Sequence, residues 1–444
     1  MSASKEETAE GGNDPHRVQI ESREDLASVL SEASTLEHMI MCEYLFAAFS
    51  LKRSESEGLA SEQLEKVRDW ERVITTVAIQ EMTHLALVNN MLVSIGSSPY
   101  FMHSNFPQPS RYFSPNIRLA LVPFGEQALR HFLYLERPEG MSIEGVPGFE
   151  VLGDLNPAEL KGEIVPTQQY FSTVGNLYRG IQKGFEDLVS KHGADRVFIG
   201  GGRTQATEAR FGLPILQEVK DLESANRAIE GIVEMGEGAR GDWNNAHFGM
   251  FLKVFKEFMD IKKANPDFRP TRPVVAAYSR PPIGSADVTV IADPFTAHVA
   301  DLFNATYGLA IQTLSRYYVH GSQNEGELQA LADAAVGTMS MAIKPLGVLL
   351  TSLPVGNRLP GVSAGPSFEL QNREYLLPHR REAFMVLEER MLELGGHAER
   401  LSRLAPSKQA GEQLKAVGGS FVSLAKGLQA AAAGDIPDPG ARPG

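Results

Sequence analysis

Two acidic residues and a histidine occupy positions that a helix would bury. From Leu26 to Tyr44, apolar residues recur every three or four positions, the spacing of an amphipathic helix, and Glu37 falls inside that apolar stripe. In a second helical pattern Glu81 lies on the apolar stripe, and His84 follows three residues later on the same face. A buried carboxylate is costly unless it is paired or binds a metal, so these positions predict a shared partner.

A metal ion between the two helices would satisfy all three side chains. In a Glu-x-x-His pair the carboxylate and the imidazole share one helix face and can reach a single ion. Oxygen ligands suit hard cations, and imidazole nitrogen selects for transition metals. Most Glu-x-x-His sequences lie on solvated helix faces, so the motif is weak by itself. Glu37 on a second apolar stripe gives the metal interpretation about the same weight as the structural one.

Two later segments have competing interpretations. His247 begins a helical pattern on the face shared with Phe251 and Phe258, where a core histidine bonded to the backbone is the simpler interpretation. Helix phase places Glu237 at the edge of an apolar stripe and Glu234 farther out, where solvent-facing acids are expected. Glycines around Glu237 distort that helix. The pattern alone therefore assigns none of these residues to a metal.

The composition excludes several functional classes. The 444 residues include 42 Lys and Arg against 55 Asp and Glu, and the charge of −13 gives no electrostatic reason to bind nucleic acid or an anionic membrane. A single cysteine excludes a disulfide framework and multi-cysteine zinc or iron–sulfur sites. The most apolar stretch, 334–350, contains Lys344 and Pro345 and is expected to be a buried helix. The polar amino terminus lacks the pattern of a signal peptide, so we expect a cytoplasmic protein.

Helical patterns cover most of the chain and predict an all-α fold of two packed layers or bundles. An irregular segment at about 100–166, rich in proline and glycine, interrupts them. The predicted organisation is a disordered tail at 1–20, a first helical domain at 21–264, a linker at 265–284, a C-terminal helical region at 285–433 and a disordered tail at 434–444. The predicted helices are 25–52, 61–95, 168–191, 221–236, 247–261, 295–318, 325–353, 380–404 and 407–432.

Four segments resemble the ferritin-like domain of the iminophenyl-pyruvate dimer synthase family, which includes the violacein-pathway and chromopyrrolate synthases. They are LASVLSEASTLEHMIMCEYLFAAFSLK, IQEMTHLALVNNMLVSIGSSPYF, SANRAIEGIVEMGEGA and HFGMF. A fifth segment, AGPSFEL, resembles one that follows this domain. The resemblance implies a ferritin-like helical bundle over about 26–261, with an irregular insertion and a second, C-terminal helical region.

Carried over by position, the resemblance also implies a set of metal ligands. These are Glu37, Glu81, His84, Glu237 and His247. Their order is similar to that of the ligands in manganese catalases. Symmetric di-iron bundles carry a second Glu-x-x-His motif that this region lacks, and the helix predicted at 168–191 has no acid on its inward face. Five ligands can still hold two metal ions if one carboxylate bridges them, although a single ion is also compatible with the set.

Other residues are expected to support these ligands or to replace one of them. They are Tyr178, His38 and Glu234. The resemblance implies two iron ions, with manganese as the alternative, and oxidation or oxidative coupling of a small amino-acid-derived metabolite by O₂ or peroxide. It further implies an upstream flavin-dependent amino-acid oxidase as a partner. A homo-oligomer is compatible with the sequence.

Two other functions stay open at this point. A peroxide scavenger like manganese catalase would need manganese and no organic substrate. A non-catalytic accessory or scaffold protein would use the inward-facing Glu and His side chains only to pair with each other. Metal content and peroxide disproportionation distinguish these functions from biosynthetic oxidation.

Overall fold

The first half of the fold is built on two long helices. The computed structural model describes residues 18–109, 118–138, 173–238, 243–280, 288–318, 323–370 and 379–433. Helix α1 spans Arg23–Ser50 and α2 spans Ser61–Ser94, so both predicted helices are confirmed with small shifts at their ends. Ser22 caps α1: its side chain accepts a hydrogen bond from the Asp25 N–H, and the Asp25 carboxylate accepts one from the Ser22 N–H. The two helices pack against each other.

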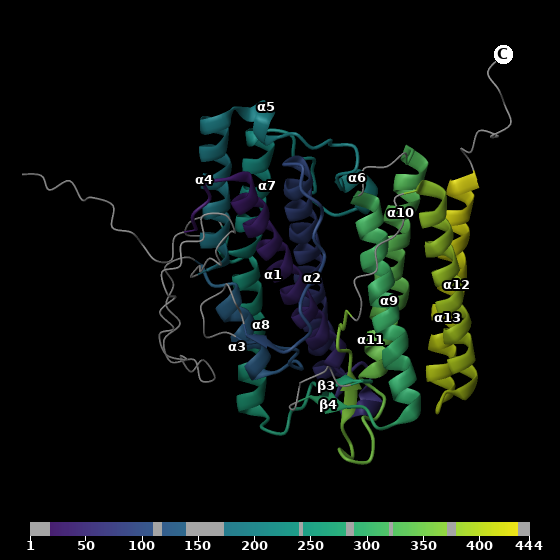
Figure 1. The fold of residues 1–444 in the computed structure, drawn as a ribbon. Helices are drawn as coiled ribbons and strands as arrows, with labels where there is room; N and C mark the ends of the chain where they lie inside the picture. The colour runs from purple at the N-terminus through teal and green to yellow at the C-terminus, as the bar shows by residue number, and fades with distance from the viewer. Residues whose placement is uncertain are drawn as a thin grey trace, which may run out of the picture.

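The other two positions of this first bundle are each shared by two shorter helices. α4 (Val174–His192) lies beside the amino-terminal half of α1, and α3 (Glu126–Leu135) lies beside its carboxyl-terminal half. α7 (Leu222–Gly236) and α8 (His247–Ala264) divide the fourth position in the same way. α7 packs on α4, α8 packs on α3, and both contact α2. In Figure 1, α4 and α7 form the upper part of the bundle, and α3 and α8 form the lower part.

The breaks between these shorter helices bring four helix ends to the middle of the bundle (Figure 1). α7 stops at Gly236, and Gly238 follows with φ +90°, a conformation that glycine adopts without steric cost. α8 begins at His247, α3 ends at Leu135 and α4 begins at Val174. Since α1 and α2 pass this level without a break, residues from six helices can converge there.

The segment predicted to be irregular, 100–166, contains α3 among its described residues, so that prediction is wrong there. Leu129, Phe132 and Leu133 give this ten-residue helix an apolar stripe that packs on α8. Because this helix is short and is flanked by prolines and glycines, its helical spacing could not be recognised in the sequence. Much of the rest of the segment, the tail at 434–444 and most of the tail at 1–20 lie outside the described residues.

A small parallel sheet lies between the lower ends of the two bundles in Figure 1. β3 (Val274–Tyr278) is its middle strand and pairs with β4 (Thr289–Val290) and β5 (Ser363–Gly365). β3 falls inside the predicted linker at 265–284, so the described part of that segment, up to residue 280, contains a paired strand. A two-stranded antiparallel sheet joins β1 (Gln108–Pro109) to β2 (Arg118–Leu119). The remaining short helices of the first half are η1 (Glu55–Glu57), α5 (Ala194–Val197) and α6 (Glu208–Phe211).

The C-terminal region forms a second helical bundle. It consists of α9 (Pro294–Tyr318), α12 (Arg380–Leu404), α13 (Lys408–Ala433) and one long helical stretch. That stretch comprises α10 (Glu325–Thr338), a π-helical turn η2 (Met339–Ile343) and α11 (Lys344–Leu350). Pro345 has no N–H to donate to the preceding turn, and the π-helical turn accommodates that loss without ending the helix.

The stretch Glu325–Leu350 is long and apolar enough to cross a membrane by length and composition alone. However, 56% of its most apolar window is buried inside the protein, where it packs against α9 and α13. Such burial is typical of a core helix, as the sequence predicted.

The two bundles meet along α1, at a contact that we call the interbundle seam and that α1 forms with α9, α11 and β5. Gly347 of α11 approaches Phe49 so closely that a Cβ at this glycine would lie 2.4 Å from the Phe49 ring. Tyr307 of α9 hydrogen-bonds to His38 of α1. The main layers of the fold are thus helical, and the predicted all-α class is confirmed.

Candidate metal centre

Three of the predicted ligands come together on α1 and α2. Glu37, Glu81 and His84 are each at most 2% exposed. His84 Nδ1 lies 2.8 Å from Glu81 Oε2 and 3.7 Å from Glu37 Oε2, so one ion could contact all three side chains. The helix phase counted from the sequence correctly predicted that these side chains face the interior.

The second oxygen of Glu81 faces a different group. His247 Nδ1, at the start of α8, lies 2.9 Å from Glu81 Oε1 and 3.5 Å from Glu136 Oε2. Glu136 directly follows the last residue of α3. Glu81, Glu136 and His247 thus form a second buried set of neighbouring ligand atoms. The two sets share the Glu81 carboxylate, which is the arrangement of a carboxylate that bridges two ions.

Two buried tyrosines orient the outer carboxylates. The Tyr178 hydroxyl, on α4, donates a hydrogen bond to Glu37 Oε1, and the Tyr44 hydroxyl, on α1, donates one to Glu136 Oε1. In both carboxylates the other oxygen is the one that faces a histidine. Such hydrogen bonds hold a carboxylate in one orientation. Tyr178 therefore lies where a residue that supports a ligand is expected.

The two histidines carry buried nitrogen atoms that no hydrogen bond satisfies. His84 Nε2 and His247 Nε2 make no hydrogen bond to the described residues, whereas His247 Nδ1 pairs with Glu81 Oε1 at 2.9 Å. Buried polar atoms are nearly always paired, because an unpaired one costs about 1–3 kcal/mol. The five side chains supply three carboxylates and two imidazoles, a donor set that suits ions such as Fe²⁺ or Mn²⁺. On these grounds the residues fit a metal centre.

The charges of the centre act mainly on one another. Within the described residues, the five groups form ion pairs with each other and none with Arg or Lys. Burial and the negative charge of Glu81 raise the pKa of Glu37 to about 8, and the same two causes raise the pKa of Glu136. Burial opposes a charge on Glu81, but His247 and His84 outweigh it and hold the pKa of Glu81 well below its usual range. The centre thus concentrates negative charge on the carboxylate that both ligand sets share.

The pKa values of both histidines in the centre are raised. Burial lowers the pKa of both rings, but the Glu81 carboxylate overcomes it and raises the pKa of His84 to about 9 and that of His247 to about 10. Without a metal, both imidazoles therefore hold a proton beside the Glu81 carboxylate, and a bound metal ion would have to replace these protons.

Glu237, predicted as a ligand, lies outside both ligand sets. It follows the last residue of α7, and its Oε1 accepts a hydrogen bond from the N–H of Gly175 at the start of α4. A Cβ on Gly175 would lie 2.3 Å from that oxygen, so a larger residue at position 175 would displace the Glu237 carboxylate. The charge of Glu237 also acts on Arg137. In this arrangement Glu237 joins α7 to α4, and Glu136 supplies the carboxylate beside His247.

Two residues predicted as alternative ligands point elsewhere. Glu234, expected to support or replace a ligand, is exposed on α7 and lies outside both ligand sets, in agreement with its helix phase. His38 follows Glu37 in the sequence but is bonded to Tyr307 in the interbundle seam. Because successive helix residues are rotated by about 100°, the neighbour of a ligand faces another side of the helix.

Glu136 was not predicted as a ligand from the sequence. Leu129 and Phe132 precede it by seven and four residues, so it continues the apolar stripe of α3. That spacing was the available signal. The described part of the helix predicted at 168–191 is α4, and it carries no inward-facing acid. α3 shares that position of the bundle, and Glu136 at its end supplies the carboxylate.

Comparison with known proteins agrees with this architecture. A family model described as Ferritin-like matches residues 30–256. The dichlorochromopyrrolate synthase of Lentzea aerocolonigenes is 25% identical over 424 residues, which cover 88% of this chain and 40% of that protein. The 2-imino-3-(indol-3-yl)propanoate dimerase of Chromobacterium violaceum is 24% identical over 373 residues, which cover 79% of this chain and 34% of that protein. The chain therefore spans less than half the length of these two relatives.

A solved structure, that of a ferritin-like protein from Caulobacter vibrioides, aligns with a TM-score of 0.44 and 18% identity over 71% of this chain and 96% of that one. The names of the two relatives confirm the predicted resemblance to the iminophenyl-pyruvate dimer synthase family. The region matched by the family model contains all five residues of the candidate metal centre. The chain belongs to the ferritin-like family.

Proposed function

We propose that this chain is a non-haem oxidoreductase that holds two iron ions at the candidate metal centre and acts with O₂ or peroxide on a small amino-acid-derived metabolite. The buried carboxylates and imidazoles support this proposal because they form a pre-arranged ligand set in the interior of the bundle. Iron bound there would supply one-electron redox chemistry and a coordination position for the oxidant. Tyr44 and Tyr178 would hold the outer carboxylates in place.

The position of Glu81 carries the proposal. Its two oxygens face His84 at 2.8 Å and His247 at 2.9 Å, in two separate ligand sets. A bridging carboxylate is how five side chains can serve two ions. Each set contains three protein side chains, and three protein ligands with an open position are typical of catalytic metal sites, as in zinc enzymes.

The scaffold alternative accounts for only part of this geometry. His84 and His247 do lie next to Glu81, as expected if these groups only pair with each other. A closed structural network would also satisfy its buried polar atoms, whereas both histidines keep nitrogens without a hydrogen-bond partner. These unpaired nitrogens favour a cation over a closed network.

The name of one relative suggests the class of substrate. That protein is a dimerase of 2-imino-3-(indol-3-yl)propanoate. For this chain we propose an α-imino acid made from an aromatic amino acid. Joining two such molecules through a new carbon–carbon bond removes two hydrogen atoms, which reduce one H₂O₂ to two H₂O. A flavin-dependent amino-acid oxidase would make both the imine and the peroxide, so it is the partner that this chemistry requires.

Metal analysis of the purified 444-residue chain tests the metal centre. We expect about two iron ions per chain, their loss in Glu81→Ala, and a partial loss in Glu136→Ala, which removes a ligand from one set only. Glu234→Ala is the matched control, because this acid is exposed and outside both sets. Wild-type iron content in folded Glu81→Ala protein would refute the centre.

A coupled assay tests the reaction. The chain is incubated with an aromatic L-amino acid and a flavin-dependent amino-acid oxidase, and dimeric products are sought by mass spectrometry. We expect a dimer with the wild type and none with Glu81→Ala. Manganese in place of iron, rapid peroxide disproportionation and no dimer would instead support a peroxide scavenger.

A further inference from the structure

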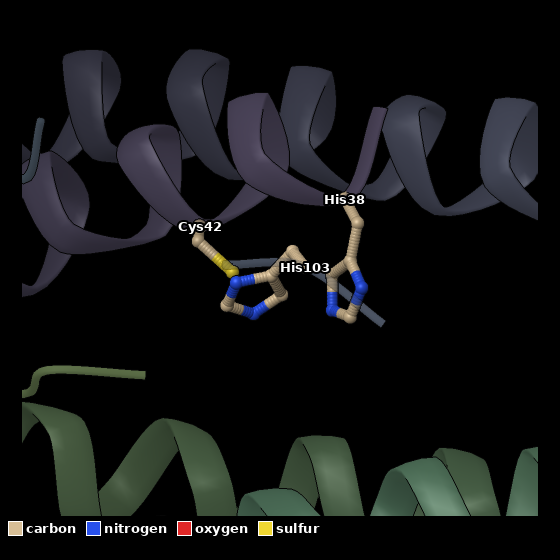
Figure 2. A group of neighbouring side chains, drawn as sticks. All are labelled: His38, Cys42 and His103. Carbon is tan, nitrogen blue, oxygen red and sulfur yellow. The ribbon is translucent and has the colours of Figure 1, made fainter. Parts of the chain in front are cut away.

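A second cluster of metal-binding residue types lies in the interbundle seam. His38 and Cys42 come from α1, and His103 comes from the loop after α2. Figure 2 shows His38 and Cys42 pointing from α1 towards the second bundle, with His103 between them. All three are buried, and their ligand atoms lie within 4.8 Å of one another. The chain's single cysteine belongs to this cluster.

Tyr307 of α9 completes the cluster from the other side. Its hydroxyl oxygen lies 2.6 Å from His38 Nε2, 2.7 Å from His103 Nε2 and 3.4 Å from Cys42 Sγ. His38 and Cys42 are four residues apart on one helix face, a spacing at which two side chains can reach one ion. The two bundles thus bring four polar atoms to one point.

The available hydrogen atoms cannot satisfy this cluster. His103 Nδ1 lies 2.9 Å from the Ser104 carbonyl oxygen, so it carries the hydrogen and leaves a lone pair on Nε2 facing Tyr307. If His38 carries its hydrogen on Nδ1, its Nε2 lone pair competes for the one Tyr307 hydrogen. If it carries the hydrogen on Nε2, its buried Nδ1 has no hydrogen-bond partner among the described residues. Either tautomer leaves a buried nitrogen unpaired, which is rare in proteins.

A cation removes this conflict, because it binds the imidazole and thiolate lone pairs directly. Two nitrogen atoms and one sulfur atom are ligands for zinc and monovalent copper, whereas magnesium and calcium prefer oxygen. The aromatic rings of Phe106 and Phe368 pack against His103 and Tyr307, so the surroundings are apolar. A thiolate there would neutralise part of the ion's charge.

We propose that His38, Cys42 and His103 form a second metal site, for Zn²⁺ or Cu⁺, with the Tyr307 oxygen available as a fourth ligand. The site connects α1 and the loop after α2 to α9, so a bound ion stabilises the contact between the two bundles. It is independent of the proposed function, because Glu37 and His38 face different sides of α1.

Cobalt(II) tests the proposal, because a cobalt–thiolate bond gives an intense near-ultraviolet band and Cys42 is the only thiol in the chain. We expect this band when the metal-free 444-residue chain is titrated with Co²⁺. Cys42→Ser should abolish it, and His103→Asn should shift its midpoint to higher Co²⁺ concentration. Glu81→Ala, the control that removes the carboxylate centre, should keep it.

Competition identifies the ion. Displacement of the cobalt band by Zn²⁺ indicates zinc, and displacement by Cu⁺ alone indicates copper. The favoured ion should also raise the Tm of the wild type and of Glu81→Ala but not that of Cys42→Ser. Wild-type protein that shows no thiolate band when Co²⁺ fills the carboxylate centre overturns the proposal, whether or not any variant folds.

Discussion

Tyr178→Phe removes one hydroxyl group with almost no change in packing, so this variant isolates the effect of one hydrogen bond on the metal centre. Without this hydroxyl Glu37 loses its donor and its fixed orientation. Hydrogen bonds that support metal ligands are worth about 10–100-fold in metal affinity, so we expect Tyr178→Phe to weaken iron binding by that factor. Competition with a chelator measures it.

A matched control for Tyr178→Phe is Tyr317→Phe, whose buried hydroxyl donates to the Gln205 carbonyl and lies outside both ligand sets. Its metal affinity should equal that of the wild type. Equal affinities in all three proteins would mean that the hydrogen bond to Glu37 does not support a ligand.

Glu32 of α1 predicts a pH-dependent stability. Burial raises its pKa to about 8, from 4.5. The folded state therefore keeps a proton that the unfolded state loses between these pH values, so the free energy of unfolding falls as pH rises from 4.5 to 8. Glutamine does not titrate, so Glu32→Gln abolishes this fall in the free energy of unfolding. We expect the variant to be more stable than the wild type at pH 9, by on the order of 1 kcal/mol or more, and equal to it near pH 4.

Urea unfolding at a series of pH values measures the effect of Glu32→Gln. A stability difference between the two proteins that stays constant from pH 4 to pH 9 would contradict the assignment, because it could not come from the titration of this carboxyl.

At the scale of elements, α3 brings Glu136 to the metal centre only while its apolar face holds it on α8. Phe132 is the main contact: its ring lies 4.6 Å from that of Tyr44 and 5.1 Å from that of Phe251. We expect Phe132→Ala to lower the free energy of unfolding by about 3–5 kcal/mol. It should also reduce iron content, because Glu136 follows one helical turn later.

The control for Phe132→Ala is Val386→Ala on the exposed face of α12, which should change stability by less than about 0.5 kcal/mol. Iron content equal to that of the wild type in folded Phe132→Ala protein would show that α3 does not position a ligand.

Most helices could be predicted because a long helix shows its apolar periodicity in the sequence, whichever elements it packs against. Arg380–Leu404 was predicted to the residue, and the bounds of α1 moved by two residues. α3 could not be predicted, because ten residues contain too few turns to outweigh the surrounding prolines and glycines. β3 was missed for a similar reason: short strands depend on neighbours that are distant in the sequence, here β5.

At the scale of the whole molecule, the close fit of Gly347 against Phe49 couples the two bundles. A valine at this position would force the helices apart, and overpacking of this kind costs about 1–3 kcal/mol. We expect Gly347→Val to lower the Tm and both bundles to unfold in a single transition, measured by calorimetry.

Gly419→Ala in α13 is the matched control for Gly347→Val, because a Cβ there meets no atom within 4 Å. It should leave the Tm unchanged or raise it, since alanine favours a helix over glycine. Two separate transitions in Gly347→Val would instead show that the bundles fold independently.

The sequence by itself determined which side chains of α1 and α2 face inward, because a helix repeats every 3.6 residues and its phase can be counted. Glu37, Glu81 and His84 follow from that count. Only the tertiary structure decided that Glu136, rather than Glu237, completes the second ligand set. Where one helix ends against another depends on packing between distant segments, and no local periodicity records it.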